Sequence, residues 1–284
     1  MAAEITRFAP SPTGLLHAGH AMSARFAFEA ADVASGGRFL LRIEDIDRSR
    51  CRPAFEAAIY EDLAWLGLRW ETPVRRQSEH FAQYQAALAD LEKRRLLYPC
   101  FCTRADLQRE IAGAASAPHL PLTGSEGAIY PGTCRALSAV EGAQKKRDGI
   151  PYALRLRMDD ALKAAGSLTW TDAVRGPQAA TPDIFGDIVL GRKDIPASYH
   201  LACTLDDALQ GVTLVTRGED LFAATHIHRL LQALFDLPTP RYAHHSLITD
   251  AAGKKFSKRD NAVTLRALRE GGATPADIMA LAVK

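Results

Sequence analysis

The segment FAPSPTGLLHAGH, residues 8–20, places two prolines, two glycines and two histidines between apolar flanks. Before it, EITRFAP (4–10) predicts a short strand. After it, AMSARFAFEAADVA (21–34) has the apolar spacing of a helix and stops at Gly36–Gly37. RFLLRIED (38–45) then predicts a buried strand that ends in carboxylates. A strand, a glycine-containing turn, a helix and a strand form a βαβ unit. This unit favours an α/β fold with a parallel sheet and ligands at the carboxyl ends of its strands.

The rest of the chain continues this pattern with one interruption. Apolar periodicity predicts helices at about 54–66 and 78–96. Residues 99–150 hold three of the five cysteines and a Pro/Gly/Ser-rich run, which indicates an insertion with little core of its own. The later segments predict strands in YALRLRM, SLTWTDAV, DIVLGRK, VTLVTRGED and YAHHSLITD, an amphipathic helix in LFAATHIHRLLQALF, and two short final helices, the second starting at Thr274–Pro275.

Composition limits the classes of protein that remain. The chain has 284 residues, 47% of them apolar, and a net charge of only +2, which does not mark a bulk nucleic-acid binder. The first residues lack the basic start and apolar run of a signal peptide, and no stretch approaches the about 20 apolar residues of a membrane span. Five cysteines without such a signal favour a reducing compartment. We therefore expect a cytoplasmic enzyme that binds no membrane.

Two motifs predict a triphosphate site. His17 and His20 lie at the start of a helix, where unpaired N–H groups suit a phosphate, and Gly19 allows a ligand to approach the backbone. Near the other end of the chain, KKFSKRD (254–260) brings Lys255 and Lys258, which can neutralise a leaving pyrophosphate. Taken alone, the first motif also fits a capped helix with surface histidines, and the second a solvated basic turn.

The pair of motifs resembles the signature of class I aminoacyl-tRNA synthetases. RFAPSPTGLLHAGH, RIEDID, SYHLA, RGED and KKFSKR narrow the resemblance, over nearly the whole chain, to the glutamyl-tRNA synthetase catalytic domain. Ala18 and Phe256 differ from the residues that are usual at these positions of the two family motifs, and both are apolar packing positions. The resemblance implies a Rossmann-type parallel sheet with a zinc-containing insertion and a short helical tail. The expected division is into residues 1–98 and 181–250 as the two halves of the Rossmann domain, 99–180 as the insertion, and 251–284 as the lysine loop and tail.

The resemblance also assigns roles to residues. It implies ATP, with Mg²⁺, as a substrate, and L-glutamate as the amino acid. The side chains expected to stabilise the reacting phosphates are those of His17, His20 and Lys258, and the ATP contacts further include Gly19, Lys255 and Ser257. The expected glutamate contacts are Arg7, Ser11, Glu44, Tyr199 and Arg217, where an arginine fork meets a carboxylate and Glu44 meets the ammonium group. Asp45 and Asp47 are interpreted as structural charges.

The clustered cysteines predict a metal site. Cys100, Cys102 and Cys134 make an incomplete tetrahedral zinc site, and one residue of spacing in a straight strand would point the first two to opposite faces, so a tight turn is required. His119 is a chemically obvious fourth ligand. The compact glutamyl-queuosine branch of the family has C-x-C followed by Y-x-x-x-C, and this resemblance favours Tyr130 instead. We expect one structural Zn²⁺ per chain, with reduced loop cysteines as the alternative.

The length of the tail distinguishes further alternatives. Only 24 residues follow Asp260, too few for the helical anticodon-reading domain of ordinary glutamyl-tRNA synthetases. The resemblance to the compact branch then implies glutamate activation without RNA and transfer to queuosine at the wobble position of tRNA(Asp). Independently of the resemblance, we expect a monomer. Three alternatives stay open: a minimal glutamyl-tRNA synthetase core or fragment that charges the acceptor end, a nucleotidyltransferase with another acceptor, and a catalytically silent paralogue.

Overall fold

The N-terminal βαβ unit forms as predicted. The computed structural model describes residues 3–103, 105–108, 123–124, 127–247 and 263–281. Strands β1 (Ile5–Phe8) and β2 (Arg38–Ile43) pair in parallel, α1 (Ala18–Ala31) connects them, and β3 (Arg75–Arg76) extends the sheet in parallel beside β2. Helix α1 ends before the expected Gly36–Gly37 stop, because Asp32 already adopts a left-handed conformation with φ of 49°.

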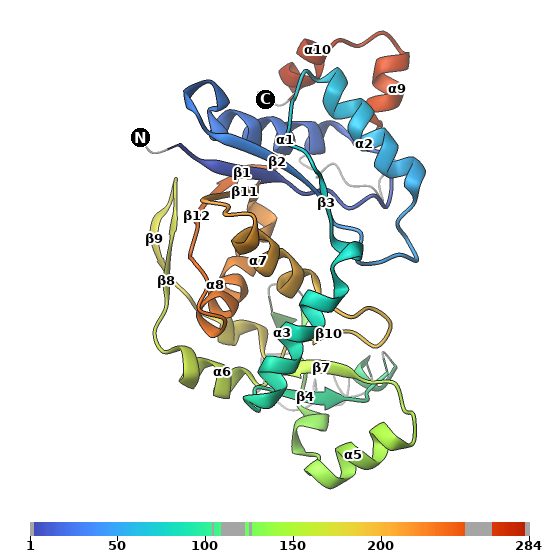
Figure 1. The fold of residues 1–284 in the computed structure, drawn as a ribbon, viewed down its shortest axis with the longest axis vertical. Helices are drawn as coiled ribbons and strands as arrows, with labels where there is room; N and C mark the ends of the chain where they lie inside the picture. Colours follow the sequence, from blue (N-terminus) through green and yellow to red (C-terminus); the bar gives the residue numbers. More distant parts are fainter. Residues whose placement is uncertain (1–2, 104, 109–122, 125–126, 248–262, 282–284) are drawn as a thin grey trace.

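The second half of the sheet contains the later strands in the order β11-β12-β8-β9. β11 is parallel to β12 and β12 to β8, whereas β9 is antiparallel to β8. The two halves meet where β1 lies beside β11, since the Thr213 N–H donates to the Ile5 carbonyl at 3.0 Å (Figure 1). The bounds of these strands are β8 Thr169–Asp172, β9 Gly176–Ala179, β11 Leu214–Gly218 and β12 Arg241–His245. From β1 the chain moves outward to β2, and from β11 it moves outward the other way to β12. In open α/β sheets such a switch point is where ligands bind.

Helices cover the sheet in two apolar clusters. The first packs the alanine stripe of α1 against α2 (Pro53–Trp65), α9 (Leu265–Glu270) and α10 (Pro275–Leu281). The second joins α3 (Phe81–Lys93), α6 (Met158–Ala165), α7 (Tyr199–Leu209) and α8 (Ala224–Leu234). Figure 1 shows α9 and α10 beside α1 and α2, at the opposite end of the molecule from α6. The predicted helices at 54–66 and 78–96 are thus present as α2 and a shorter α3, which a 3₁₀ turn at Gln77–Glu79 precedes.

A second, antiparallel sheet builds the inserted part. Its strand order is β10-β7-β4. The bounds are β4 Leu97–Cys100, β7 Ala153–Leu156 and β10 Val189–Gly191, with a two-stranded ribbon β5 (Thr123–Gly124) and β6 (Gly127–Ala128) and helix α5 (Ala139–Arg147) nearby in sequence. The remaining 3₁₀ turns are Val33–Ser35, Thr133–Ala136, Pro182–Phe185 and Glu219–Leu221. In the chain, β8 and β9 of the first sheet lie between β7 and β10 of the second, so the chain passes between the two sheets more than once. The expected domain boundaries remain expectations. Within the described residues, no helix has the length and apolarity to cross a bilayer.

Candidate active site

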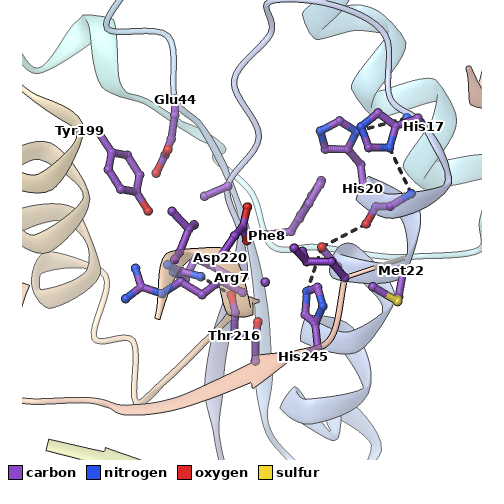
Figure 2. A pocket seen from close by; sticks show the side chains of 17 residues that line it. Arg7, Phe8, His17, His20, Met22, Glu44, Tyr199, Thr216, Asp220 and His245 are labelled. Carbon is purple, nitrogen blue, oxygen red and sulfur yellow. Dashed lines mark hydrogen bonds between the residues drawn. The ribbon is translucent and has the colours of Figure 1, made fainter. Parts of the chain in front are cut away.

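A cavity of about 390 Å³ opens at the switch point of the sheet. Its walls come from the carboxyl ends of β1, β11 and β12, from the first turn of α1 and from α7. Figure 2 shows Glu44 and Tyr199 at one end of the cavity and His17 and His20 at the other, with Arg7 between them. The lining residues are Arg7, Phe8, Ala9, His17, Gly19, His20, Met22, Ser23, Glu44, Tyr199, Thr216, Arg217, Gly218, Asp220, Leu221, His245 and Leu247. Of the segments predicted to share a site, the histidine turn and those that carry Glu44, Tyr199 and Arg217 meet in space, whereas residues 254–260 lie outside the described residues.

The two histidines are held by the backbone at the start of α1. His17 is the N-cap residue, and its Nδ1 accepts the Gly19 N–H at 3.1 Å. Nδ1 of His20 accepts the His17 N–H at 3.2 Å, and the two rings lie 3.8 Å apart. A neutral imidazole that accepts at Nδ1 carries its proton on Nε2, so Nε2 is the atom from which each ring can donate. A β-carbon on Gly19 would stand 3.0 Å from the His17 ring, which gives a second reason for glycine here.

The segment after the lysine motif is paired with this histidine turn. Thr264 forms a backbone bridge with His17, and the Leu265 N–H donates to the Leu16 carbonyl at 2.8 Å. On the other side of the motif, Leu247 lines the cavity. Lys255, Ser257 and Lys258 themselves lie outside the described residues. The described chain on either side of 248–262 thus adjoins the cavity.

Arg7 already has a carboxylate partner that sequence analysis missed. Its Nε and Nη2 atoms donate to Asp207 of α7 at 2.8 and 3.3 Å, and Nη1 donates to the Thr216 carbonyl at 3.0 Å. Burial opposes the charge of Arg7, but the adjacent carboxylate more than offsets it, so its pKa is raised. The same carboxylate accepts from Arg42 at 2.7 Å. The adjacent acidic pair in TLDDAL was the only sequence signal of this network.

Glu44 is fixed by the second buried arginine. Arg42 Nη2 donates to Glu44 Oε1 at 3.1 Å, and both side chains are almost fully buried. Burial raises the pKa of Glu44, and the two arginines nearby act in the opposite direction. Glu44 thus brings an acceptor group to the cavity wall at the end of β2, as its position after the predicted strand indicated.

Arg217 is held by neutral acceptors instead of a carboxylate. Its Nε donates to His244 Nε2 at 3.2 Å and its Nη2 to Thr225 Oγ1 at 2.5 Å. Its Nη1 lies 3.0 Å from His228 Nδ1. Burial, followed by the charge of Arg217, lowers the pKa of His228, so that ring stays neutral and can accept. Among the described residues Arg217 forms no ion pair, although it is buried and lines the cavity. This leaves its charge available to an anionic ligand.

A carboxylate stands behind one of these acceptors, on the far side of the His244 ring. His244 Nδ1 lies 2.6 Å from Asp172 Oδ2, and both side chains are fully buried. Because the ionised carboxylate only accepts, the His244 proton sits on Nδ1 and its Nε2 faces Arg217 as an acceptor. Burial, despite the carboxylate, lowers the pKa of His244 to about 4. Asp172 and His244 therefore orient Arg217 without neutralising it directly.

Tyr199 and Ser11 connect the cavity to a neighbouring one. Tyr199, the first residue of α7, packs its ring 5.6 Å from that of His228, and burial raises the pKa of its phenol. Ser11 lines a second cavity, of which Glu44 and Tyr199 also form part of the wall. Four of the five expected glutamate contacts thus line the first cavity, and Ser11 lies next to it.

The three clustered cysteines meet beyond the end of β4. The sulfur atoms of Cys100, Cys102 and Cys134 all lie within 4.8 Å of one another. The strand ends at Cys100, so Cys102 no longer follows the straight strand that would point the two thiols to opposite faces. The Tyr130 hydroxyl lies 3.6 Å from Cys102 Sγ and accepts the Cys134 N–H at 2.7 Å. His119 lies outside the described residues.

This donor set fits a zinc ion. Tetrahedral ligands at about 2.3 Å from zinc stand about 3.8 Å from one another. The three sulfurs, which all lie within 4.8 Å of one another, are compatible with that spacing. Arg155 lies over the Tyr130 ring at 3.8 Å and places positive charge beside the thiols. Burial and the neighbouring sulfurs raise the pKa of Cys102 to about 12. A divalent cation bound to the sulfurs would relieve the repulsion between the thiolates. The cluster can therefore hold a metal, with Tyr130 in position to contribute.

Comparison with known proteins agrees with this geometry. The catalytic-domain model of class I tRNA synthetases for glutamate and glutamine matches residues 5–283, and the chain belongs to this family. Among its relatives, a protein of Rhodobacter capsulatus named glutamyl-Q tRNA(Asp) synthetase is 51% identical, over 98% of this chain and 99% of the relative. One of the same name from Symbiobacterium thermophilum is 42% identical over 96% and 83%. These findings confirm the family resemblance and the predicted α/β fold.

Glutamate–tRNA ligases match over a smaller part of their length. The Aquifex aeolicus ligase is 38% identical over 95% of this chain but only 54% of its own. A solved glutamate tRNA ligase from Elizabethkingia meningosepticum, in complex with its amino acid, superposes with a TM-score of 0.75 at 30% identity, covering 91% of this chain and 52% of that one. The chain thus spans about half the length of these longer relatives.

Proposed function

We propose that this chain activates L-glutamate with ATP, without RNA, and transfers the glutamyl group to queuosine at the wobble position of tRNA(Asp). One observation carries the proposal: a single cavity is lined both by paired imidazoles at a helix N-terminus and by a buried arginine that has no carboxylate partner among the described residues. The full-length similarity to proteins named glutamyl-Q tRNA(Asp) synthetase supports the choice of acceptor. We also propose a cytoplasmic monomer.

At the nucleotide end, His17, Gly19 and His20 bind the ATP phosphates. The Nε2–H groups of the two rings donate to phosphoryl oxygens, and the N-terminus of α1 adds its partial positive charge. Lys258, assisted by Lys255 and Ser257, neutralises the departing Mg²⁺-pyrophosphate. The bridge between Thr264 and His17 supports this role, because it brings the chain that follows the lysine motif to the histidine turn.

At the amino-acid end, Arg217 binds the side-chain carboxylate of glutamate. Arg7 contributes from the floor of the cavity, where Asp207 fixes its orientation. The Tyr199 hydroxyl donates to the same carboxylate, and Ser11 completes the pocket from the neighbouring turn. Glu44 accepts from the α-ammonium group. A carboxylate and a cation that line the same pocket select an amino acid with an acidic side chain.

The reaction runs in two steps. An oxygen of the glutamate α-carboxylate attacks the α-phosphorus of ATP, the bond from that phosphorus to the bridging oxygen breaks, and pyrophosphate leaves. A hydroxyl oxygen of the queuosine cyclopentenediol then attacks the carbonyl carbon of the mixed anhydride. AMP leaves, and its phosphate takes the hydroxyl proton. Positioning and stabilisation of phosphate charge account for the first step without a protein base.

We further propose that Cys100, Cys102, Tyr130 and Cys134 hold one Zn²⁺, which ties together the segments that follow β4 and precede α5. Such a closed four-ligand site is structural and adds folding free energy without entering the reaction. The division of the chain at residues 98, 180 and 250 remains part of the same proposal.

The second candidate is a minimal glutamyl-tRNA synthetase that charges the acceptor end, which the match to longer glutamate–tRNA ligases favours. Glutamate-dependent ATP–pyrophosphate exchange without RNA tests the first step. Charging of queuosine-containing tRNA(Asp), of the same RNA without queuosine, and of tRNA(Glu) tests the acceptor. The proposal requires product only with the first RNA, and product with tRNA(Glu) alone would establish the second candidate.

A further inference from the structure

Three side chains from three elements form a line of polar contacts that begins at the cavity wall. Arg217 lies on β11, His228 lies on α8, and His200 lies in the first turn of α7. The Arg217 Nη1 atom is 3.0 Å from His228 Nδ1, and His228 Nε2 is 3.2 Å from His200 Nδ1. Helices α7 and α8 pack against each other, which brings the two imidazoles together (Figure 1). The line thus connects the cavity wall at β11 with the start of α7.

Arg217 fixes the direction of these hydrogen bonds. A guanidinium group has donors and no acceptor, so His228 must accept at Nδ1. His228 is buried, and burial together with the charge of Arg217 lowers the pKa of its ring, which leaves the ring a single proton. That proton must sit on Nε2, where it points at His200. His200 in turn must accept at Nδ1, because two N–H groups cannot share one hydrogen bond.

The position of the proton on His228 decides whether Arg217 is held. With the proton on Nδ1, the ring would meet the Arg217 N–H with an N–H of its own. The nitrogen that carries the proton is set by the hydrogen bond that the other nitrogen makes. For the second imidazole on Arg217, His244, the Asp172 carboxylate sets it. For His228, the group recorded at the other nitrogen within the described chain is His200.

A neutral acceptor behind His228 suits a site that binds an anion. A carboxylate already stands behind His244, and a second one behind His228 would place two negative charges around the Arg217 guanidinium. Those charges would repel an acidic substrate. The Nδ1 atom of a neutral His200 accepts the same hydrogen bond without adding a negative charge.

We propose that His200 is a positioning residue for amino-acid recognition. By accepting the Nε2–H of His228, it keeps His228 Nδ1 open as an acceptor and thereby fixes the Arg217 guanidinium that binds the side-chain carboxylate of glutamate. The inference rests on the proposed function. His200 is not among the residues that line the first cavity, so it acts through His228 and not by contact with glutamate.

Two substitutions separate the acceptor atom of His200 from the bulk of its ring. His200→Asn places an amide oxygen where Nδ1 lies and so retains the acceptor, whereas His200→Leu fills the space with a side chain that has none. His80→Leu is the matched control, because His80 is also half-buried at the start of a helix and lines neither cavity. Glutamate-dependent pyrophosphate exchange at varied glutamate and at varied ATP gives both KM values, and the thermal midpoint verifies folding.

We expect His200→Leu to raise KM for glutamate about 10-fold, the lower end for loss of a hydrogen bond to a charged group. KM for ATP should change by less than about threefold, because the nucleotide end is untouched. His200→Asn should stay within about threefold of the wild type for both constants, and His80→Leu should change neither. A folded His200→Leu protein with the wild-type KM for glutamate, or an asparagine variant as impaired as the leucine variant, would overturn the inference.

A second measurement is independent of the proposed function. In protein with ¹⁵N-labelled histidine rings, the nitrogen chemical shifts report which atom of each ring carries the proton, and the signals that disappear in His228→Gln identify His228. Its proton should lie on Nε2, and a proton on Nδ1 would overturn the inference even where exchange is normal. Absence of glutamate-dependent exchange in the wild-type protein would instead overturn the proposed function, and the role of His200 in amino-acid recognition with it.

Discussion

Asp172→Asn tests whether the buried Asp172–His244 pair aims Arg217 at glutamate. The carboxylate accepts from His244 through Oδ2, and its Oδ1 accepts the N–H groups of Val174 and Arg175 at 2.9 and 2.8 Å. An asparagine must place its NH₂ group against one of these two sides. If the NH₂ group faces His244, the ring must accept at Nδ1 and carry its proton on Nε2, and that proton then points at the Arg217 N–H. If the NH₂ group faces the turn, it points at two backbone N–H donors. Either orientation breaks the chain of hydrogen bonds that ends at Arg217.

The size of the effect follows from that broken chain. A hydrogen bond to a charged group contributes about 1.5–3 kcal/mol, but Arg217 keeps its contacts with Thr225 and His228. We therefore expect the lower end of the range, which is an increase of about 10-fold in KM for glutamate. KM for ATP should change by less than about threefold, because the imidazoles of the nucleotide end are untouched.

Pyrophosphate exchange at varied glutamate and at varied ATP measures both constants, and the thermal midpoint of unfolding verifies that the variant is folded. Asp183→Asn, at an exposed position in the turn after β9, is the control. The reasoning is refuted if a folded Asp172→Asn protein keeps the wild-type KM for glutamate, or if KM for ATP rises by the same factor.

Three other predictions concern the lysine motif, pH and metal. Lys258→Ala should lower adenylate formation about 100-fold or more, as for loss of one charged transition-state contact, and exchange at the wild-type rate would refute its role. Because the pKa of His244 falls from 6.5 to about 4 on folding, the unfolded chain protonates this ring at a higher pH than the folded chain does. The free energy of unfolding should therefore drop by up to about 3 kcal/mol as pH falls from 6.5 to 4. Denaturant titrations should show a shallower slope for His244→Gln, and an identical slope would contradict this source. Purified protein should contain about one zinc per chain and Cys100→Ser far less, whereas near-zero zinc in both would remove the metal site.

Local sequence signals were enough to predict the elements that build the switch point. The turn chemistry of residues 8–20 and the apolar runs around it predicted β1, α1 and β2, because each depends on backbone preferences and burial within a few residues. The α8 and β11 segments were predicted for the same reason. Helix α7 was missed, since SYHLACTLDDAL has polar residues at buried positions, Thr204, Asp206 and Asp207, and these weaken its apolar period.

The partners of the site residues could not be predicted locally. Asp207 stands 200 positions from Arg7 in the chain, and only the packing of α7 under the sheet brings the two together. The pairing of β8 with β12, which places Asp172 behind His244, is likewise a long-range contact. Spacing in the sequence identified residue types suited to a substrate, but it carried no information about which protein groups those residues contact.

Arg217 has one more consequence, for the thermodynamics of the unliganded protein. Within the described part of the chain, the partners of the buried Arg217 guanidinium are neutral acceptors. A cation held in this way weakens the folded state, because water solvates the guanidinium of the unfolded chain better. Glutamate should relieve this cost on binding, and a linear apolar side chain of similar length at position 217 should yield a more heat-resistant but inactive protein. At Arg217 on β11, thermal stability and activity thus place opposite demands on the same side chain. An attempt to engineer a thermostable form should therefore leave this position unchanged.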